Sequence, residues 1–339
     1  MKILVKRSTR RFFMLIIAIA IIIGMNFQAI KTEAIKAKEY FETPVTLYSD
    51  SELKENLIQI ANDRLDFFYK VSYSKTTEKA DIVLTFDLNK LNKEKSYDMF
   101  AYSPLLIVMK SSKNLNNLKI TKSTGFLTSE KDIKDKNNDV PINCDFSKVV
   151  EAVINGKNWD ALGGPKNKQI KVYCPPLETL DGQLFKEFII RTYNNGSKTS
   201  TKEIDEKIDK FFASPNVIQT DIASKITILG DKISEYDIFV GFENEFKEIF
   251  SNQSSIKEYT TFVYPNTTIL KTVYVQFNTN DSKLKERFYA EGFVDHNAYN
   301  EFYYNEGYRI AIENNAITSN KITISDMNTQ DGINAFELN

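Results

Sequence analysis

SPLLIVM, residues 103–109, is one of two extended apolar runs in this chain, and TILKTVYVQF, residues 268–277, is the other. The segment between the two runs is predicted to contain strands and helices of its own. A chain that leaves one α/β lobe, builds a second and then returns forms two crossing strands between the lobes. The two runs therefore predict two lobes with a cleft between them, and small ligands usually bind in such interdomain clefts.

Length and composition are consistent with two lobes. The chain has 339 residues, more than one ordinary domain, and 42% of them are hydrophobic, which is enough for two packed cores. The formal net charge is −1 and the basic residues are spread along the chain. A nucleic-acid-binding protein would have a concentrated positive surface, so we expect no nucleic-acid partner.

Residues 1–34 are predicted to direct export, as a signal peptide or a signal anchor. Five lysines and arginines precede the uncharged run 12–25. This run suits a signal peptide, but residues 12–30 are also long enough to span a bilayer, so cleavage and membrane anchoring both remain open. In either case the basic end stays in the cytoplasm and the rest of the chain lies outside. The absence of cysteine near the run excludes a lipobox-type lipid anchor.

Cys144 and Cys174 are the only two cysteines. An extracellular setting would permit a disulfide between them, and two separate packing residues are the alternative. Together with the single histidine, His296, they are too few for a typical metal site. One histidine also argues against Ser-His or Cys-His catalysis, and no segment has the glycine spacing of a nucleotide-binding loop. We therefore expect no metal, no cofactor, no catalytic residues and no enzyme activity.

The first lobe is predicted to begin with a strand at residues 44–48, followed by helix-start residues at 49–51 and an amphipathic helix. Residues 67–73 alternate like a second strand, and residues 80–86 have the aliphatic density of a buried parallel strand. Ligands of open α/β sheets bind outside the carboxyl ends of the strands. Residues 49–51 and 86–88 are therefore candidates for a site.

The second lobe is predicted from a further series of segments. They are a helix at 146–154, a turn at 155–165 with the only tryptophan, a strand at 169–173, a helix start within 177–185, and strands at 225–229, 236–241 and 260–265. The junction of the strand at 169–173 with the following helix is expected to face the cleft. The chain after Ser282 is expected to be mainly helical and to complete the first lobe.

Five phrases occur in an order that is typical of a known family. They are ADIVLTF (80–86), YSPLLIVMK (102–110), NWDALGG (158–164), KVYCP (171–175) and YDIFVGFE (236–243). Over residues 43–312 the chain resembles the type 2 solute-binding proteins of bacterial import systems, the two-lobed "Venus flytrap" receptors.

This resemblance implies an α/β, two-lobed type 2 periplasmic-binding-protein fold with two crossing strands as the hinge, preceded by the N-terminal signal or anchor helix. It divides the chain into lobe 1, residues 43–108 plus 269–339, and lobe 2, residues 109–268. It also implies a location at the extracellular face of the bacterial cell membrane, either anchored or secreted.

The resemblance carries over part of a ligand site. Ser103 precedes the crossing-strand proline and typically lies at the ligand, and the loop with Ser49 and Ser51 follows the first strand. In oxyanion-binding relatives the second-lobe helix begins with a Ser-Gly-Thr-like turn. The matching stretch here, ETLDGQ at 178–183, keeps the glycine but adds two carboxylates. Each would repel an anion by about 1 kcal/mol or more, which favours a neutral or cationic solute. The candidate ligand-binding residues are Ser49, Ser51, Ser103, Thr179, Asp181, Gln183 and Glu243.

Three of these candidates also have a purely structural interpretation. Asp181 is a possible helix N-cap, Glu243 a possible first residue of a helix, and Ser103 a possible end of a strand. Two functions remain open. One is capture of a small solute for the membrane permease of an ABC-type importer. The other is a membrane-anchored sensor or accessory protein that has lost solute binding and binds a protein partner.

Overall fold

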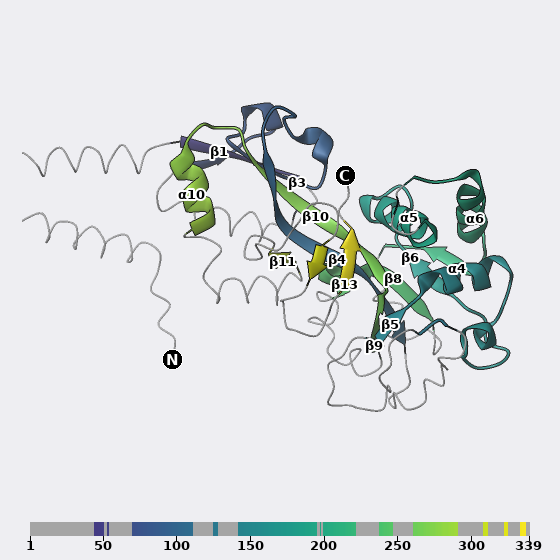
Figure 1. Cartoon of the computed structure of the whole chain (residues 1–339). Helices are drawn as coiled ribbons and strands as arrows, with labels where there is room; N and C mark the ends of the chain where they lie inside the picture. Colours follow the sequence, from purple (N-terminus) through teal and green to yellow (C-terminus); the bar gives the residue numbers. More distant parts are fainter. Residues whose placement is uncertain are drawn as a thin grey trace, which may run out of the picture.

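The computed structural model describes residues 44–50, 53, 70–110, 125–127, 142–194, 197, 199–221, 237–246, 260–290, 308–310, 322–324 and 333–336 (Figure 1). The strands in these ranges are β1 (Pro44–Ser49), β2 (Lys70–Tyr73), β3 (Ile82–Thr85), β4 (Tyr97–Lys110), β5 (Ile142–Cys144), β6 (Val172–Cys174), β7 (Val217–Gln219), β8 (Ile238–Phe242), β9 (Thr260–Pro265), β10 (Thr267–Phe277), β11 (Arg309–Ile310), β12 (Ile322–Ile324) and β13 (Ile333–Phe336). The helices are α4 (Phe146–Ile154), α5 (Leu180–Tyr193), α6 (Lys202–Phe212) and α10 (Ser282–Ala290), with short 3-10 turns η1 (Thr77–Lys79), η2 (Leu88–Lys90) and η5 (Trp159–Leu162).

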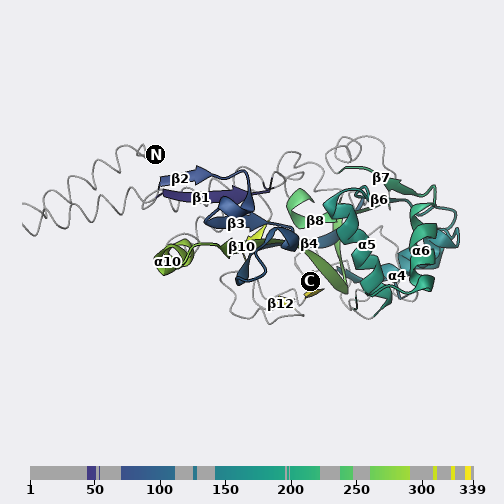
Figure 2. The ribbon, with the colours of Figure 1, turned by 90° about the horizontal axis from the view of Figure 1, so that it is seen from above.

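Two long strands organise the sheet. The main path of hydrogen-bonded strands is β2-β1-β3-β10-β4-β8-β6-β7. Tyr97 to Pro104 of β4 pair antiparallel with β10, whereas Leu105 to Lys110 pair with β8 and β9. One strand therefore passes from one half of the molecule to the other, and β10 runs beside it (Figure 2). The predicted pair of crossing strands is confirmed.

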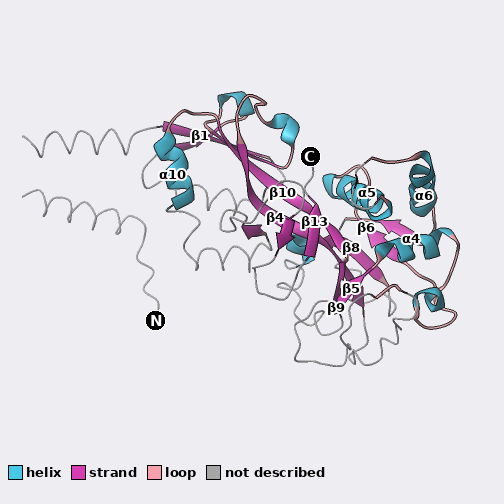
Figure 3. Ribbon diagram, viewed as in Figure 1, coloured by secondary structure: helices cyan, strands magenta, loops and turns pink. Residues whose placement is uncertain are grey.

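Each half has its own core. The first half contains β1, β2, β3 and α10, and its core cluster includes Leu47, Leu84 and Phe288. The second half contains β5 to β9 with α4, α5 and α6, which lie together beside β6 and β8 (Figure 3). The division at residues 108–109 and 268–269 stays a prediction.

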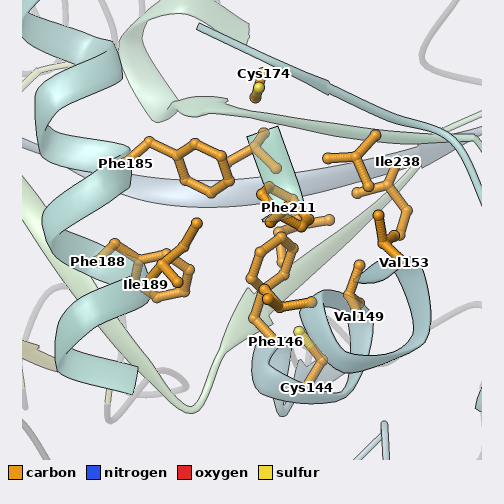
Figure 4. Close-up of a cluster of buried hydrophobic side chains, with 14 of the residues drawn as sticks. Cys144, Phe146, Val149, Val153, Cys174, Phe185, Phe188, Ile189, Phe211 and Ile238 are labelled. Carbon is orange, nitrogen blue, oxygen red and sulfur yellow. The ribbon is translucent and has the colours of Figure 1, made fainter. Parts of the chain in front are cut away.

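The helices of the second half form where the sequence supplies both a cap and an apolar face. The side chains of Asp145 and Thr201 accept hydrogen bonds from the first turns of α4 and α6. In α6, Ile204, Ile208 and Phe211 recur at helical spacing and are buried. These faces meet the aromatic residues of α5 in one apolar cluster (Figure 4).

Cys144 and Cys174 are both buried, and no disulfide joins them. They belong to the second-half core, where their sulfur atoms lie on opposite sides of the cluster (Figure 4). Burial, with the neighbouring Asp145 charge, raises the pKa of the Cys144 thiol well above its ordinary value. Of the two interpretations left open by the sequence, the structure shows two separate packing residues.

The chain after α10 differs from the expectation of a mainly helical segment. That expectation is correct for α10 but wrong for β11, β12 and β13. β11 pairs with β4 and β13 pairs with β10. β11 and β13 form hydrogen bonds with backbone groups of the two long strands. Such pairing with distant strands cannot be seen in the periodicity of these short segments.

Several expectations concern residues outside the described ranges. These include the signal segment 1–34, most of the amphipathic helix after residue 53, and the strand at 225–229. None of the helices within the described ranges is long and apolar enough to cross a bilayer.

Candidate functional site

The two halves meet where the paired strands β4 and β10 pass from one half to the other. Lys271 of β10 is the cross-strand partner of Ser103 of β4. The helix α5 begins at the same place, because its first residue, Leu180, packs against the core clusters of both halves. We use the name crossing site for the group of residues here that carries the polar chemistry: Phe86, Ser103, Asp181, Phe242, Asn244, Glu245 and Lys271.

Lys271 has a buried charge at the centre of the crossing site. Only 8% of the residue is exposed, and its Nζ lies 2.7 Å from Oδ1 of Asp181. The same Nζ lies 5.2 Å from the centre of the Phe86 ring and 5.8 Å from that of the Phe242 ring, distances at which a ring attracts a cation. Burial by itself would lower the pKa of Lys271, but Tyr308, Asp181 and Glu245 together raise it above its ordinary value. Lys271 is therefore charged.

Glu245 is a second carboxyl group beside this ion pair. Its Oε2 accepts a hydrogen bond of 2.9 Å from the N–H of Phe242, which fixes the turn after β8. Burial, followed by the charge of Asp181 and a side-chain hydrogen bond with it, raises the pKa of Glu245 to about 8, and Lys271 opposes this shift. The raised pKa favours the protonated form of Glu245 beside the ion pair.

Ser103 joins β4 to the turn after β8. It is fully buried, and its Oγ accepts a hydrogen bond of 2.9 Å from the N–H of Asn244. Asn244 is 3% exposed, and within the described part of the chain its Oδ1 has no hydrogen-bond partner. Glu243, which precedes it, is also buried and is the first of the helical residues 243–246, as its structural interpretation predicted. The structure thus brings Ser103 and Glu243 to the crossing and adds an acceptor, Asn244, that the sequence analysis did not identify.

The start of α5 uses its own polar groups. Thr179 is the N-cap: its Oγ1 accepts a hydrogen bond from the N–H of Gly182 and donates one to the carbonyl of Pro176. Gln183 is exposed, and its amide donates to the carbonyl of Leu177. The N-cap interpretation of Asp181 is therefore wrong, because Thr179 has that position and Asp181 is free to pair with Lys271.

Gly182 has a packing role in this turn. A Cβ atom on Gly182 would lie 1.9 Å from the carbonyl oxygen of Pro176. The helix and the preceding turn approach so closely that no side chain fits. The glycine that matches the oxyanion-binding turn is therefore explained by backbone packing.

The loop after β1 contains a different functional group from the serines that the sequence suggested. Ser49 ends β1, and Ser51 lies outside the described residues. Asp50, between them, is 6% exposed and accepts hydrogen bonds from Thr85 Oγ1, the N–H of Phe86 and Lys90 Nζ at 2.5, 2.9 and 2.6 Å. Burial would raise the pKa of Asp50, but the hydrogen bonds from these groups outweigh it and lower the pKa. Asp50 therefore holds the loop after β3, including Phe86, in place.

Asp50, Asn244, Glu245 and Lys271 were not among the predicted site residues. One signal was available for Lys271, since it is the only charged residue in the apolar run 268–277. Glu178, which the sequence analysis expected to repel anions, is exposed. Within the described ranges no group of three histidine, cysteine, aspartate or glutamate side chains is placed to hold a metal ion.

Comparisons with known proteins identify the fold. No protein-family model matches the chain, and no curated protein sequence matches it. Among solved structures, an extracellular solute-binding protein from Bordetella parapertussis has a TM-score of 0.52 at 11% sequence identity, and the match covers 86% of this chain and 92% of that one. PstS from Borrelia burgdorferi gives 0.47 at 12% identity, covering 79% and 98%, and a Bordetella ferric binding protein gives 0.47 at 12% identity, covering 79% and 85%. The chain has the type 2 solute-binding fold, as the order of its segments predicted.

Proposed function

We propose that this chain, which has the fold of the extracellular solute-binding proteins, binds a small solute at the crossing site between its two halves. One observation carries the proposal: both long strands, the start of α5 and the turn after β8 converge at one place with buried polar groups from each. Movement of one half against the other would open and close this place. The proposed role is binding without catalysis.

The charges at the crossing site favour a neutral or cationic solute. Asp181 and Glu245 supply two carboxyl groups, and Lys271 supplies one ammonium group. Asn244 adds a carbonyl oxygen without a partner among the described residues. A solute that donates a hydrogen bond would satisfy this oxygen. Glu178 and Asp181 repel an anion less than the sequence predicted, because Glu178 is exposed and Asp181 is ion-paired.

A thermal-shift screen of the full-length protein tests this proposal. The compounds are amino acids, polyamines, sugars, short peptides and oxyanions. A solute at 100 times its Kd stabilises the folded state by about 2.7 kcal/mol. At about 2 °C per kcal/mol, the melting temperature should rise by about 5 °C.

Asn244→Ala should weaken binding of the active compound about tenfold, since it removes the acceptor that has no partner among the described residues. The matched control is Asn155→Ala, at the exposed end of α4, which should leave the affinity unchanged. Equal affinities for all three proteins would place the solute elsewhere.

The proposed setting is the extracellular face of a bacterial membrane, with the N-terminal segment either cleaved or kept as an anchor. The proposed partner is the membrane permease of an ABC-type importer, to which the solute would be delivered. Binding of the purified protein to permease-containing vesicles, stronger with solute than without, would test this partner. Equal binding with and without solute would contradict delivery.

A second function is favoured by a specific observation. The ammonium of Lys271 already occupies the centre of the crossing site, and the side chains of Ser103, Thr179 and Gln183 bond within the chain. This arrangement suits a membrane-anchored sensor or accessory protein that has lost solute binding and uses its surface for a protein partner. A screen without a shift for any compound class would support this second function over the first.

A further inference from the structure

The ammonium of Lys271 lies between groups from both halves of the molecule. Phe86 belongs to the loop after β3 and to the first-half core, whereas Phe242 ends β8 in the second-half core. Nζ of Lys271 lies over both rings. Its carboxylate partner, Asp181, is on α5, a helix of the second half. A single side chain thus contacts groups of both halves.

Other ion pairs of the described residues have a different placement. Lys90 and Asp50, at 2.6 Å, both belong to the first half. Arg191 and Glu187 are one turn apart on α5 in the second half. These pairs stabilise local structure within one half. The pair of Lys271 with Asp181 instead connects the strand β10 to the first turn of α5.

The environment of Nζ is a recognisable kind of binding site. A carboxylate, a second carboxyl group from Glu245 and two aromatic rings surround one primary ammonium group. Carboxylates and ring faces are the groups that bind organic ammonium ions. The side chains of Lys271 and Asp181 are only 10% and 15% exposed, so water screens their attraction weakly.

We propose that the crossing site is a binding site for an alkylammonium group, that Lys271 fills it in the solute-free protein, and that this internal ligand holds α5 against β10. The inference deepens the proposed function, because it assigns a ligand class to the same site. A solute with a primary amine would compete with Lys271 for Asp181 and would release the start of α5 from β10. The test below uses no natural solute, so it fails or succeeds separately from the screen.

The first experiment is chemical rescue of Lys271→Ala in the full-length protein. Alanine keeps Cβ, and n-propylammonium replaces the missing atoms from Cγ to Nζ. We expect the melting temperature of Lys271→Ala to be lower than that of the wild type and to rise saturably with n-propylammonium chloride. Neither 1-propanol, which lacks the charge, nor sodium chloride should reproduce the rise. The control is Lys285→Ala, since Lys285 forms an exposed pair with Asp98 on the first half, and no rescue is expected there.

The second experiment distinguishes a latch, by which we mean that Lys271 holds the start of α5 against β10, from a general stabilisation of the folded protein by Lys271. Hydrogen–deuterium exchange of the amides at the start of α5 should become about tenfold faster in Lys271→Ala, a factor that corresponds to about 1.4 kcal/mol, while exchange in α6 should change less. Because n-propylammonium has no bond to β10, it should leave exchange at α5 fast even at concentrations that restore the melting temperature. If Lys271→Ala does not fold, Asp181→Asn provides the test. We expect the same faster exchange at the start of α5 in this variant, and unchanged exchange would overturn the proposal. Absence of rescue in a folded Lys271→Ala protein, or rescue equally strong with 1-propanol, would also overturn it.

Discussion

Gly182→Ala should destabilise the protein by about 2 kcal/mol. A Cβ at this position would lie 1.9 Å from the Pro176 oxygen and 2.7 Å from Cα of Leu177, where ordinary contacts begin at 3.4 Å. The turn would have to move by about 1.5 Å, the difference between 3.4 and 1.9 Å, and its atoms belong to the backbone. Overpacking of this kind costs up to about 3 kcal/mol, and the better helix propensity of alanine returns about 1 kcal/mol.

Urea unfolding of the wild type and the variant measures this loss as a lower midpoint at an unchanged slope. Gly156→Ala is the matched control, because nothing lies within 4 Å of its Cβ position and only its φ of +62° is unfavourable. The control should lose about 1 kcal/mol through backbone strain alone. A Gly182→Ala protein as stable as the wild type would refute the packing explanation. The glycine would then need another role at the start of α5, such as a close approach to a ligand.

Three further predictions follow from buried groups. The unfolding free energy should decrease as pH rises from about 4.5 to about 8, because the folded chain keeps a proton on Glu245 that the unfolded chain releases. Urea unfolding across this pH range measures the decrease, and Glu245→Gln should make it smaller. Asp50→Asn should lower the unfolding free energy by about 2 kcal/mol at pH 7. The pKa of Asp50 is lowered in the folded state, so the wild type loses stability on acidification below pH 3.8, and the variant should lose less. Cys144 and Cys174 should resist a maleimide in the native protein and both react after unfolding without reductant, as measured by intact mass; a failure to react when unfolded would indicate a disulfide.

The architecture could be predicted from the sequence because the two long strands that connect the halves are buried on both faces. Such strands are nearly continuous apolar runs, and both runs were recognisable. The order of the two runs and of the intervening segments then limited the fold to a chain that crosses twice. The segments after α10 could not be predicted in this way, since β11 and β13 form by pairing with β4 and β10.

Ser103 and Asp181 lie at the crossing site, and Glu243 is buried between Phe242 and Asn244 of that site. Thr179 and Gln183 bond within the first turn of α5 and the residues before it. The part of these residues in ligand binding stays a prediction. A sequence shows which residues begin a helix and does not show where that helix rests. The partner of Asp181 depends on the register of β10 against β4 and on the docking of α5. Lys271 could therefore be noticed as a charge in an apolar run, but its partner could not be named.

Leu180 and Asp181, at the start of α5, have different roles. A buried ion pair is an inefficient means of holding two halves together, because removing both charges from water cancels much of their attraction. Leu180 packs against both cores and has no such cost. The ion pair differs in its response to competition, since another ammonium ion can take the place of Lys271 at Asp181. On the latch proposal, Leu180 determines where α5 rests, and the pair of Asp181 with Lys271 determines when it is released.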